Sequence, residues 1–257
     1  MRTYRVLFST LHVVVVTFFF SPALVVAQEK ESLKLLVRQT DGGQHKGRHL
    51  KKIKRALSNN GCRVEVGFID KDSATPDDTD LEFSPDPIDQ TKSRLPNFRL
   101  IAQARTIEGE TKIGSAILVI AATGVDSLTL LAGERFSFVT PFSVTGYQLP
   151  IQMLADAGVK PTIEQTIFVG NHVGAVSMLL HGDTFAAAAA APLARDWLSI
   201  NKELAIVALS PLVETGGWWI NKRVEAGLAM TCAINLAQLT GSQLKVFPAW
   251  VGGFNPQ

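Results

Sequence analysis

Residues 133–161 read GERFSFVTPFSVTGYQLPIQMLADAGVKP, and this stretch decides the fold. It begins as an apolar strand, passes through a corner of small polar residues and continues as a helix that Gly158 ends. Ser143, Thr145 and Gly146 stand at that corner. A hydroxyl there can simply cap the helix, and free backbone N–H groups at a helix start can also hold an anion. The corner alone leaves both interpretations open.

A second corner of the same form follows in the chain. The strand TIFVG at 166–170 leads through Asn171 and His172 into an apolar helix that Gly182 ends. A histidine at a helix start can donate a hydrogen bond to an anion, although a lone histidine is more often a surface or capping residue. Two polar corners in succession strengthen the case for an anion site, and two unrelated caps remain an equal alternative.

The remaining sequence alternates between strand and helix patterns in the same way. Strands are predicted at 33–37, 62–68, 99–105, 115–121, 135–139, 204–210 and 218–220. The apolar run TFAAAAA at 184–190 is ambiguous, and one interpretation is a strand that leads into the next helix. Helices are predicted over 45–61, 145–158, 172–182, around 192–198 and over 222–241, and 70–96 is predicted to be loop with one short strand at 80–83. Such alternation predicts parallel sheets with helices on both faces, which place ligands at the carboxyl ends of their strands.

The first 27 residues have the order of a secretory signal peptide. Arg2 and Arg5 precede the apolar run LHVVVVTFFF, and small residues lead up to Ala27. We therefore expect cleavage after Ala27. An uncleaved membrane anchor is the alternative, but the apolar run is short for a span of about 20 residues. No cysteine lies near the cut, so we do not expect a lipid-modified N-terminus.

The charge balance argues against nucleic acid as a partner. The leader holds two of the 25 Lys and Arg residues and none of the 23 Asp and Glu residues, so residues 28–257 carry 23 − 23 = 0 formal charges. A basic run between Lys46 and Arg55 is typical of a solvated helix face. A chain of 257 residues is long enough for one large or two small domains.

Two cysteines, Cys62 and Cys232, leave two interpretations open. An exported protein could join them as a disulfide, but their positions in the sequence do not show that they lie close together. Two separate buried thiols are the alternative. Without paired histidines the two cysteines do not predict a zinc site. The sequence also lacks the G-x-S-x-G, H-E-x-x-H and G-x-x-x-x-G-K-[ST] motifs, so we predict no catalytic residues, no metal and no cofactor.

The order of these motifs resembles a known family. Residues 133–161, followed by IFVGNHVGAVSMLLHGD at 167–183, resemble the phosphate/phosphite/phosphonate type of periplasmic substrate-binding protein of ABC importers. The segment LAIVALSPLVETGGWWINK at 204–222 is similar to that family's return segment. The resemblance extends roughly from Leu128 to Lys222, and the combined run is more specific than any one motif in it.

The resemblance implies an α/β protein with a two-lobe, type II periplasmic-binding-protein-like fold. Each lobe would be a mostly parallel sheet flanked by helices, two crossing strands would join the lobes, and the ligand would lie in the cleft between them. We place lobe 1 in residues 28–122 plus 210–257 and lobe 2 in residues 123–209.

Five ligand-binding residues are implied by position in the family motifs. Ser143 and Thr145, with the N–H groups around Gly146, would hold the oxygen atoms of an oxyanion, and His172 would donate a further hydrogen bond. Tyr147 completes the predicted set, although its ring could equally belong to the core.

The sequence also departs from the family pattern. Val144 stands where the motif often has a hydroxyl, and Phe185 with an alanine run replaces acidic residues that commonly bind an amino group of the ligand. The first lobe departs further, since its binding corner is shortened to DKDSATPDDTD at 70–80 and only Asp80 to Pro85 resembles the family's corner. The departures put one wall of the cleft in question.

The sequence thus predicts an exported, periplasmic, monomeric solute-binding protein, and not an enzyme. It would capture a small oxyanion of the phosphonate, phosphite or phosphate class for the membrane permease of an ABC importer. The alternative is a sensory or adaptor protein of the same fold that signals to a membrane-bound kinase or cyclase without transport.

Overall fold

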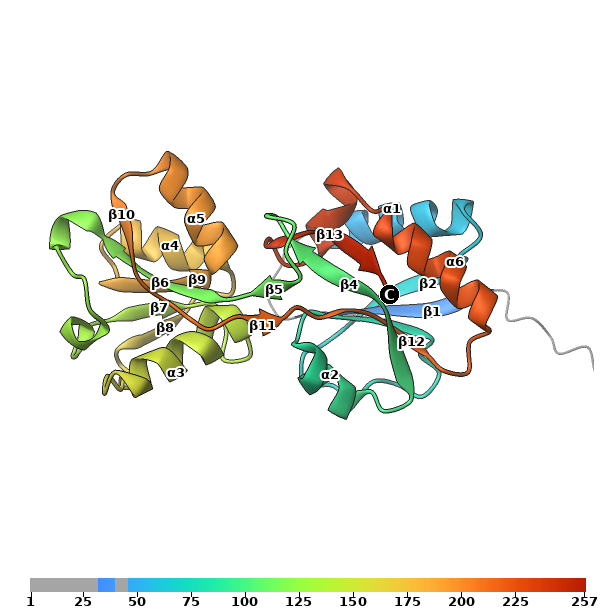
Figure 1. Ribbon diagram of the computed structural model, residues 1–257, viewed down its shortest axis with the longest axis horizontal. Helices are drawn as coiled ribbons and strands as arrows, with labels where there is room; N and C mark the ends of the chain where they lie inside the picture. Colours follow the sequence, from blue (N-terminus) through green and yellow to red (C-terminus); the bar gives the residue numbers. More distant parts are fainter. Residues whose placement is uncertain (1–31, 40–45) are drawn as a thin grey trace, which may run out of the picture. The chain divides into compact units, whose positions relative to one another are not determined.

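The computed structural model describes residues 32–39 and 46–257 (Figure 1). Residues 31–257 form one compact unit. The predicted signal peptide at 1–27 lies outside the described residues. Within the described ranges, no helix combines the length and the apolar character that crossing a membrane requires.

The first sheet contains six strands in the order β13-β4-β12-β3-β1-β2. The strands are β1 (Leu33–Arg38), β2 (Val64–Ile69), β3 (Leu81–Ser84), β4 (Phe98–Thr106), β12 (Gly217–Asn221) and β13 (Val251–Pro256). β1 pairs in parallel with β2 and β3, whereas β12 is antiparallel to β3 and β4, and β13 to β4. Four of the six strands therefore run in one direction. The helices around this sheet are α1 (Lys46–Asn59), α2 (Ile88–Arg94), α6 (Ala226–Ala237) and the 3₁₀ turn η4 (Gly241–Val246).

The second sheet contains five strands in the order β10-β6-β9-β7-β8. They are β6 (Ser115–Ile120), β7 (Phe136–Phe138), β8 (Thr166–Phe168), β9 (Ala186–Ala190) and β10 (Leu204–Leu209). β7 is parallel to β8 and β9, and β6 is antiparallel to β9 and β10. α3 (Leu149–Asp156), α4 (His172–Leu180), α5 (Ala191–Ile200) and the 3₁₀ turns η1 (Ala121–Thr123) and η2 (Leu128–Leu131) complete this half.

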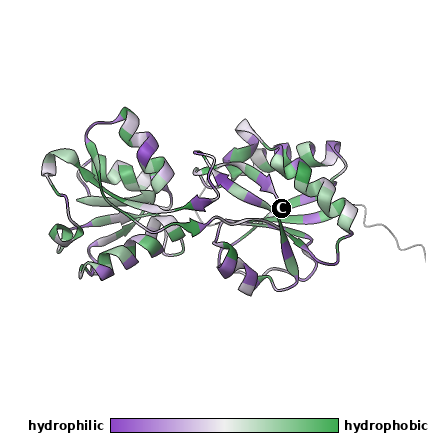
Figure 2. Cartoon of the chain, in the orientation of Figure 1, coloured by the Kyte–Doolittle hydropathy of each residue, from purple (hydrophilic) through white to green (hydrophobic). Residues whose placement is uncertain are grey.

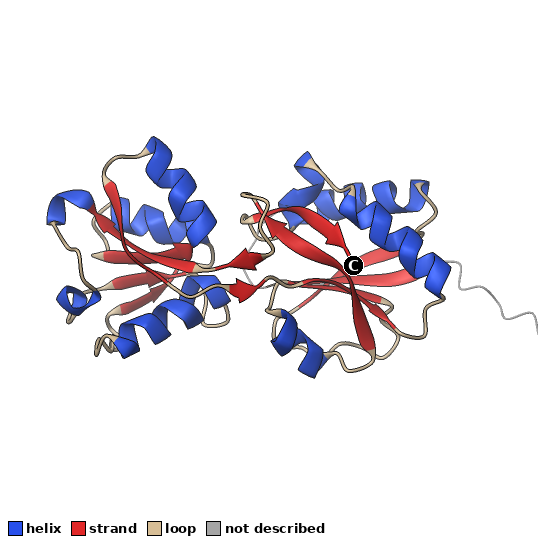
Figure 3. Cartoon of the chain, viewed as in Figure 1, coloured by secondary structure: helices blue, strands red, loops and turns tan. Residues whose placement is uncertain are grey.

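Side-chain alternation explains why each sheet carries helices on two faces (Figure 3). In β6, Ala116 and Leu118 pack in one apolar cluster with residues of α4 and α5, while Ile117 and Val119 pack in another with Leu154 of α3. The strands of the second sheet are accordingly hydrophobic along most of their length (Figure 2). The predicted α/β, two-lobe fold is confirmed.

A two-stranded sheet of β5 (Lys112–Ile113) and β11 (Val213–Glu214) lies on the two chain segments that run between the large sheets. These are the crossing strands that the family resemblance implies. β6 begins directly after β5 and pairs within the second sheet, although the sequence interpretation had placed residues up to 122 in lobe 1. The strand pairing therefore favours a change of lobe at β5, before β6, because β6 contributes to both apolar clusters of the second half.

Most predicted elements are present, and the exceptions have local causes. The predicted loop at 70–96 contains α2, which starts after Pro87 in a stretch rich in turn-forming residues. β13 has the sequence VGGFNP, whose glycines and proline are unusual in a strand and are tolerated because β13 is an edge strand. The helix predicted from residue 145 begins as a π-helical turn, η3 (Val144–Gln148), before α3.

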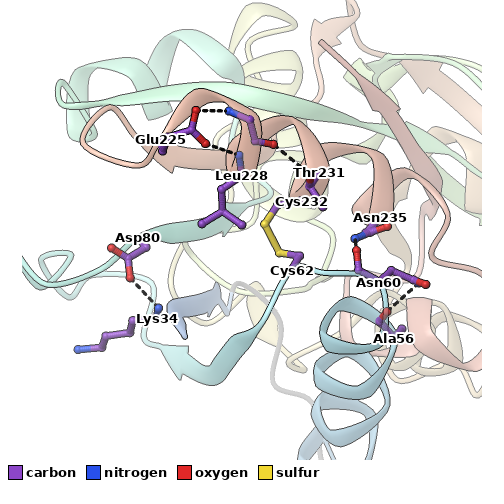
Figure 4. Close-up of a disulfide and its surroundings, with 11 residues drawn as sticks. Lys34, Ala56, Asn60, Cys62, Asp80, Glu225, Leu228, Thr231, Cys232 and Asn235 are labelled. Carbon is purple, nitrogen blue, oxygen red and sulfur yellow. Dashed lines mark hydrogen bonds between the residues drawn. A yellow bond between two sulfur atoms is a disulfide. The ribbon is translucent and has the colours of Figure 1, made fainter. Parts of the chain in front are cut away.

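Cys62 and Cys232 form a disulfide, which decides between the two interpretations left open by the sequence (Figure 4). The bond joins the segment before β2 to α6 across a sequence separation of 170 residues. Beside it, the Asn235 side-chain amide donates to the Asn60 carbonyl over 2.8 Å, which further joins α6 to the end of α1. Both cysteines are fully buried in the core of the first lobe.

Candidate functional site

The corner after β7 is a helix cap. Ser143 is the N-cap residue of η3, and its Oγ accepts a hydrogen bond from the Gly146 N–H over 3.1 Å. The Ser143 carbonyl accepts from the N–H groups of Tyr147 and Gln148. The capping interpretation of this corner is therefore correct for Ser143 and Gly146, and it leaves the question of which donors remain for a ligand.

The remaining donors lie at Val144 and Thr145. The backbone N–H groups of these two residues, the first of the helix, have no protein acceptor in the described ranges, as is normal for a helix start. The Thr145 hydroxyl likewise makes no hydrogen bond to a described residue, although the side chain is 95 % buried. The Thr145 carbonyl accepts from the Ser115 hydroxyl over 2.6 Å, which fixes the backbone at this point. The N–H groups without a described acceptor thus lie directly before Gly146, at Val144 and Thr145.

Gly146 and Tyr147 have structural roles at this corner. A Cβ atom on Gly146 would lie 2.3 Å from the Val139 Cγ2 atom, so only glycine allows the helix to approach the end of β7. The Tyr147 ring contacts the rings of Phe138 and Phe168 edge-on, with centroids 5.1 Å apart in both cases. Neither residue lines the pocket described below.

His172 lies at the second corner but is directed into the fold. It is only 2 % exposed, and its Nδ1 accepts a hydrogen bond from the Ala190 N–H over 3.3 Å. A neutral ring that accepts at Nδ1 carries its proton on Nε2. His172 thereby joins the start of α4 to the end of β9, while the helix itself is capped by Asn171, whose Oδ1 accepts from the Gly174 N–H. His172 does not line the pocket.

A small pocket, partly open to solvent, lies at the first of these corners, with a cavity volume of about 20 Å³. Residues from five parts of the chain line it: the segment after β3, the crossing strands β5 and β11, the start of η3 and one position near the C-terminus (Pro85, Asp86, Pro87, Ile113, Ser143, Val144, Thr145, Val213, Glu214 and Trp250). Two of the five predicted ligand-binding residues, Ser143 and Thr145, are therefore brought together at its wall.

The wall contributed by the first lobe is dominated by Asp86. This residue is 2 % exposed, and its carboxylate forms ion pairs with Lys71 and with Arg94, the latter over 2.7 Å. Burial by itself would raise the pKa of Asp86, but the charges and hydrogen bonds of Lys71 and Arg94 outweigh it and hold the pKa below the ordinary value of 3.8. Asp86 is thus an ionised carboxylate whose charge is already balanced.

Behind Asp86 lies a buried ionic network at the carboxyl ends of β1 and β3. The Arg38 Nε donates to Glu82 over 2.7 Å, with both side chains fully buried. The Arg38 Nη1 also donates to three backbone carbonyls between residues 70 and 73. The Thr75 hydroxyl accepts a hydrogen bond from Arg38 and donates one to Glu82. Arg94 forms ion pairs with both Glu82 and Asp86. We call the five charged residues Arg38, Lys71, Glu82, Asp86 and Arg94 the first-lobe ionic network.

Sequence reasoning missed this network and most of the pocket wall. Arg38 ends an apolar strand pattern, LKLLVR, and an arginine at that position could have indicated a buried partner. Asp86 directly follows the Asp80 to Pro85 segment that resembles the family's corner, so that resemblance pointed near the correct place. Trp250, four-fifths of the chain away from β1, had no comparable signal. Among the described residues no cluster of His, Cys, Asp or Glu could hold a metal ion.

Comparison with protein families gives one result for this chain. Residues 85–237, more than half of the sequence, match the model of the phosphonate-type periplasmic substrate-binding protein of ABC transporters. The chain belongs to this family. Its members are solute-binding proteins of the periplasm that work with membrane permease components, and they are not enzymes. No curated protein matches the chain.

Solved structures share the family fold at low sequence identity. PhnD1 from Prochlorococcus marinus, in complex with methylphosphonate, is 18 % identical with a TM-score of 0.64 over 88 % of this chain and 92 % of its own. XAC2383 from Xanthomonas citri, bound to ATP, is 15 % identical with a TM-score of 0.66 over 88 % and 91 %. A binding protein component of an ABC phosphonate transporter from Pseudomonas aeruginosa is 14 % identical with a TM-score of 0.60 over 88 % and 81 %. These likenesses support the type II, two-lobe fold of the family.

Proposed function

We propose that this family member is exported, captures a small phosphorus oxyanion of the phosphonate, phosphite or phosphate class, and delivers it to the permease of an ABC importer. One observation carries the proposal. The N–H groups of Val144 and Thr145 and the Thr145 hydroxyl have no described protein partner, and the residues that carry them line a pocket. Donors left over at a helix start are suited to negative oxygen atoms.

The predicted site residues then have two kinds of role. Thr145 and Ser143 would contact the ligand, since the Ser143 hydroxyl can still donate its own proton while its oxygen caps Gly146. Gly146 and Tyr147 would hold the corner in place through their contacts with Val139, Phe138 and Phe168. His172 would support the neighbouring corner at Ala190.

The charges on the pocket wall favour a ligand that carries a positive group as well as its negative oxygen atoms. Among the described residues that line the pocket, the charged ones are Asp86 and Glu214, and the cations that pair with them do not themselves line it. Lys71 and Arg94 balance the charge of Asp86. The repulsion of a doubly negative ligand and the attraction of an amino group on a phosphonate therefore rest on Glu214, whose pair with Lys112 is solvent-exposed. We therefore propose that a zwitterionic aminophosphonate binds more tightly than phosphate or methylphosphonate. Glu214 would take the place of the acidic residues that the second lobe lacks.

The test is calorimetric titration of the chain from Gln28 with phosphate, phosphite, methylphosphonate, aminoethylphosphonate and sulfate, in the wild type and in Thr145→Val. This substitution keeps the side-chain volume and removes only the hydroxyl. A lost hydrogen bond to a charged oxygen costs about 1.5–3 kcal/mol, so the affinity should fall roughly 10- to 150-fold. The free protein should keep its melting temperature, because the hydroxyl has no protein partner to lose.

Ser199→Ala is a matched control, since it removes an exposed hydroxyl from α5, which contributes nothing to the pocket wall. It should leave every affinity unchanged. Binding of a phosphorus oxyanion that is equally tight in Thr145→Val and wild type would reject the site, and the absence of binding by the whole panel would reject the function.

A further inference from the structure

The exposed charged residues of α1 are all basic in the part of the helix that the structure describes. The helix contains six cations and no acidic residue (KGRHLKKIKRALSN). Ile53 and Leu57 are buried in the first-lobe core, and Arg48, Lys51, Lys52, Lys54 and Arg55 are exposed. Since residues 28–257 have no net formal charge, this short helix concentrates positive charge that the rest of the chain balances elsewhere.

These cations have no local partner. None of Arg48, Lys51, Lys54 and Arg55 forms an ion pair with a described residue, and Lys52 makes only a hydrogen bond to the Ser242 hydroxyl. Arg48 with Lys52, and Lys51 with Arg55, are like charges at spacing i, i+4, which destabilise a helix. The arrangement is therefore unfavourable for the isolated protein, and a negative partner would relieve it.

α6 presents the complementary feature beside α1. It has no charged residue in its twelve positions (AGLAMTCAINLA). Met230 and Ile234, one helical turn apart, are 53 % and 46 % exposed. The two helices pack together and both bury residues in the same core cluster of the first sheet. Both helices lie on one side of that sheet (Figure 1), so their exposed sides belong to the same surface of the first lobe.

A recess next to the basic side of α1 adds hydrogen-bond donors. It is lined by Lys52, Arg55, Ala56 and Asn59 of α1, by Thr240, the N-cap of η4, and by the first three residues of η4, Gly241, Ser242 and Gln243. No carboxylate lines it. Two cations with hydroxyl and amide groups around a polar recess suit a phosphate group.

We propose that the solvent side of α1 and α6 binds the surface of an anionic phospholipid bilayer. The α1 cations attract the headgroup phosphates, and Met230 and Ile234 enter the apolar boundary below them. Basic residues next to exposed apolar residues are the combination that holds a protein at a membrane interface. An acidic protein surface would use the cations but would leave the uncharged side of α6 without a contact, so the bilayer accounts for more of the observations.

The experiment is flotation of the chain from Gln28, which keeps the whole compact unit, with vesicles of equal parts phosphatidylglycerol and phosphatidylcholine or of phosphatidylcholine alone. The test variant is Arg48→Gln/Lys51→Gln/Lys52→Gln/Arg55→Gln. Its control, Lys92→Gln/Arg135→Gln/Lys160→Gln/Lys202→Gln, removes four exposed cations that form no described ion pair on other surfaces. A third variant, Met230→Ser/Ile234→Ser, tests the apolar part.

The wild type should bind the anionic vesicles at low salt and release them as salt rises. The α1 variant should lose binding by at least about 50-fold, since each cation beside an anionic surface strengthens binding about fivefold. Its melting temperature should not fall, because like-charge pairs are removed. The control variant should keep most of the binding, and the α6 variant should weaken it without changing its salt dependence. Equal binding to both vesicle types, or equal losses in the two charge variants, would overturn the proposal.

Discussion

The carboxyl ends of the parallel strands in the two sheets differ in how their polar groups are used. After β1 and β3, the first-lobe ionic network pairs the buried Arg38, Glu82 and Asp86 with one another or with the partly buried Lys71 and Arg94. After β7, the second-lobe corner has no charge and leaves donors at Val144 and Thr145 without a described protein acceptor. The same position in an α/β sheet can thus be closed by internal ion pairs or kept available for a ligand. We expect mutations in the first corner to change stability, and mutations in the second to change binding.

The largest effect is expected for Arg38→Met. The substitution leaves Glu82 fully buried without its principal partner and frees three backbone carbonyls that Arg38 now bonds. Removing one partner of a buried ion pair typically costs about 3–5 kcal/mol. Chemical denaturation should show a fall of that size in the free energy of unfolding.

The double variant Arg38→Met/Glu82→Met separates charge burial from packing. It should be more stable than Arg38→Met alone, because it no longer buries an unpaired carboxylate. Thr145→Val, at the second corner, should leave the free energy of unfolding unchanged. If Arg38→Met and Thr145→Val had equal effects on stability, the contrast between the two corners would be wrong.

The second largest effect is expected from removing the disulfide, which is present in the first lobe and has no counterpart in the second. Cys62→Ala/Cys232→Ala should lower the free energy of unfolding by about 2–5 kcal/mol, since the bond closes a long loop. Hydrogen exchange should accelerate mainly in β1, β2 and α6. Equal acceleration in β7 to β9 would show that the two lobes unfold as one unit instead.

An intermediate effect is expected for Gly146→Ala, which tests whether this glycine serves packing or ligand approach. The added Cβ would clash with Val139, and such overpacking costs about 1–3 kcal/mol. Adding Val139→Ala should make the Gly146→Ala substitution less destabilising than it is alone, as expected for residues in contact.

Gly47→Ala is the matched control for that measurement. It also adds a Cβ at a helical glycine, but nothing lies within 4 Å of the added atom. Alanine is the better helix former, so this variant should be more stable by about 0.5–1 kcal/mol. Full stability of Gly146→Ala together with lost ligand affinity would assign the glycine to the ligand after all.

The sequence predicted the architecture well because strand and helix signals alternate regularly from β7 onward. The apolar run of β7, the stop at Gly158 and the stop at Gly182 all depend on neighbouring residues only, and all are present as predicted. The family resemblance added the two-lobe fold and the crossing strands. β5 and β11 have two residues each, too few to produce any periodic pattern of their own.

The site was predicted less completely, for reasons of distance along the chain. Ser143 and Thr145 are close neighbours in sequence, and both line the pocket. The other lining residues include Asp86, Glu214 and Trp250, which only tertiary structure brings near them. The position of His172 was equally beyond sequence reasoning, because its partner Ala190 lies 18 residues away in a run of identical alanines.

The smallest expected effect is on stability at acidic pH. It tests how much the ion pairs of Asp86 contribute to the first-lobe corner. Lys71 and Arg94 hold the pKa of Asp86 below 3.8 in the folded protein, despite the opposing effect of burial. The unfolded chain then binds a proton more readily than the native protein does as the pH falls below about 4. The stabilisation from Asp86 is therefore fully present at neutral pH and is lost as the pH falls through the folded pKa. In denaturation series from pH 6 downward, Asp86→Asn should show a shallower loss of stability than the wild type.

Glu108→Gln is the control for this measurement. It removes another carboxylate of lowered pKa, paired with Arg195 at the surface, and should change the slope less because solvent screens that pair. A slope in Asp86→Asn equal to that of the wild type would mean that the pairs with Lys71 and Arg94 do not distinguish the folded from the unfolded state, and the first corner would then owe its stability to Arg38 and Glu82 alone.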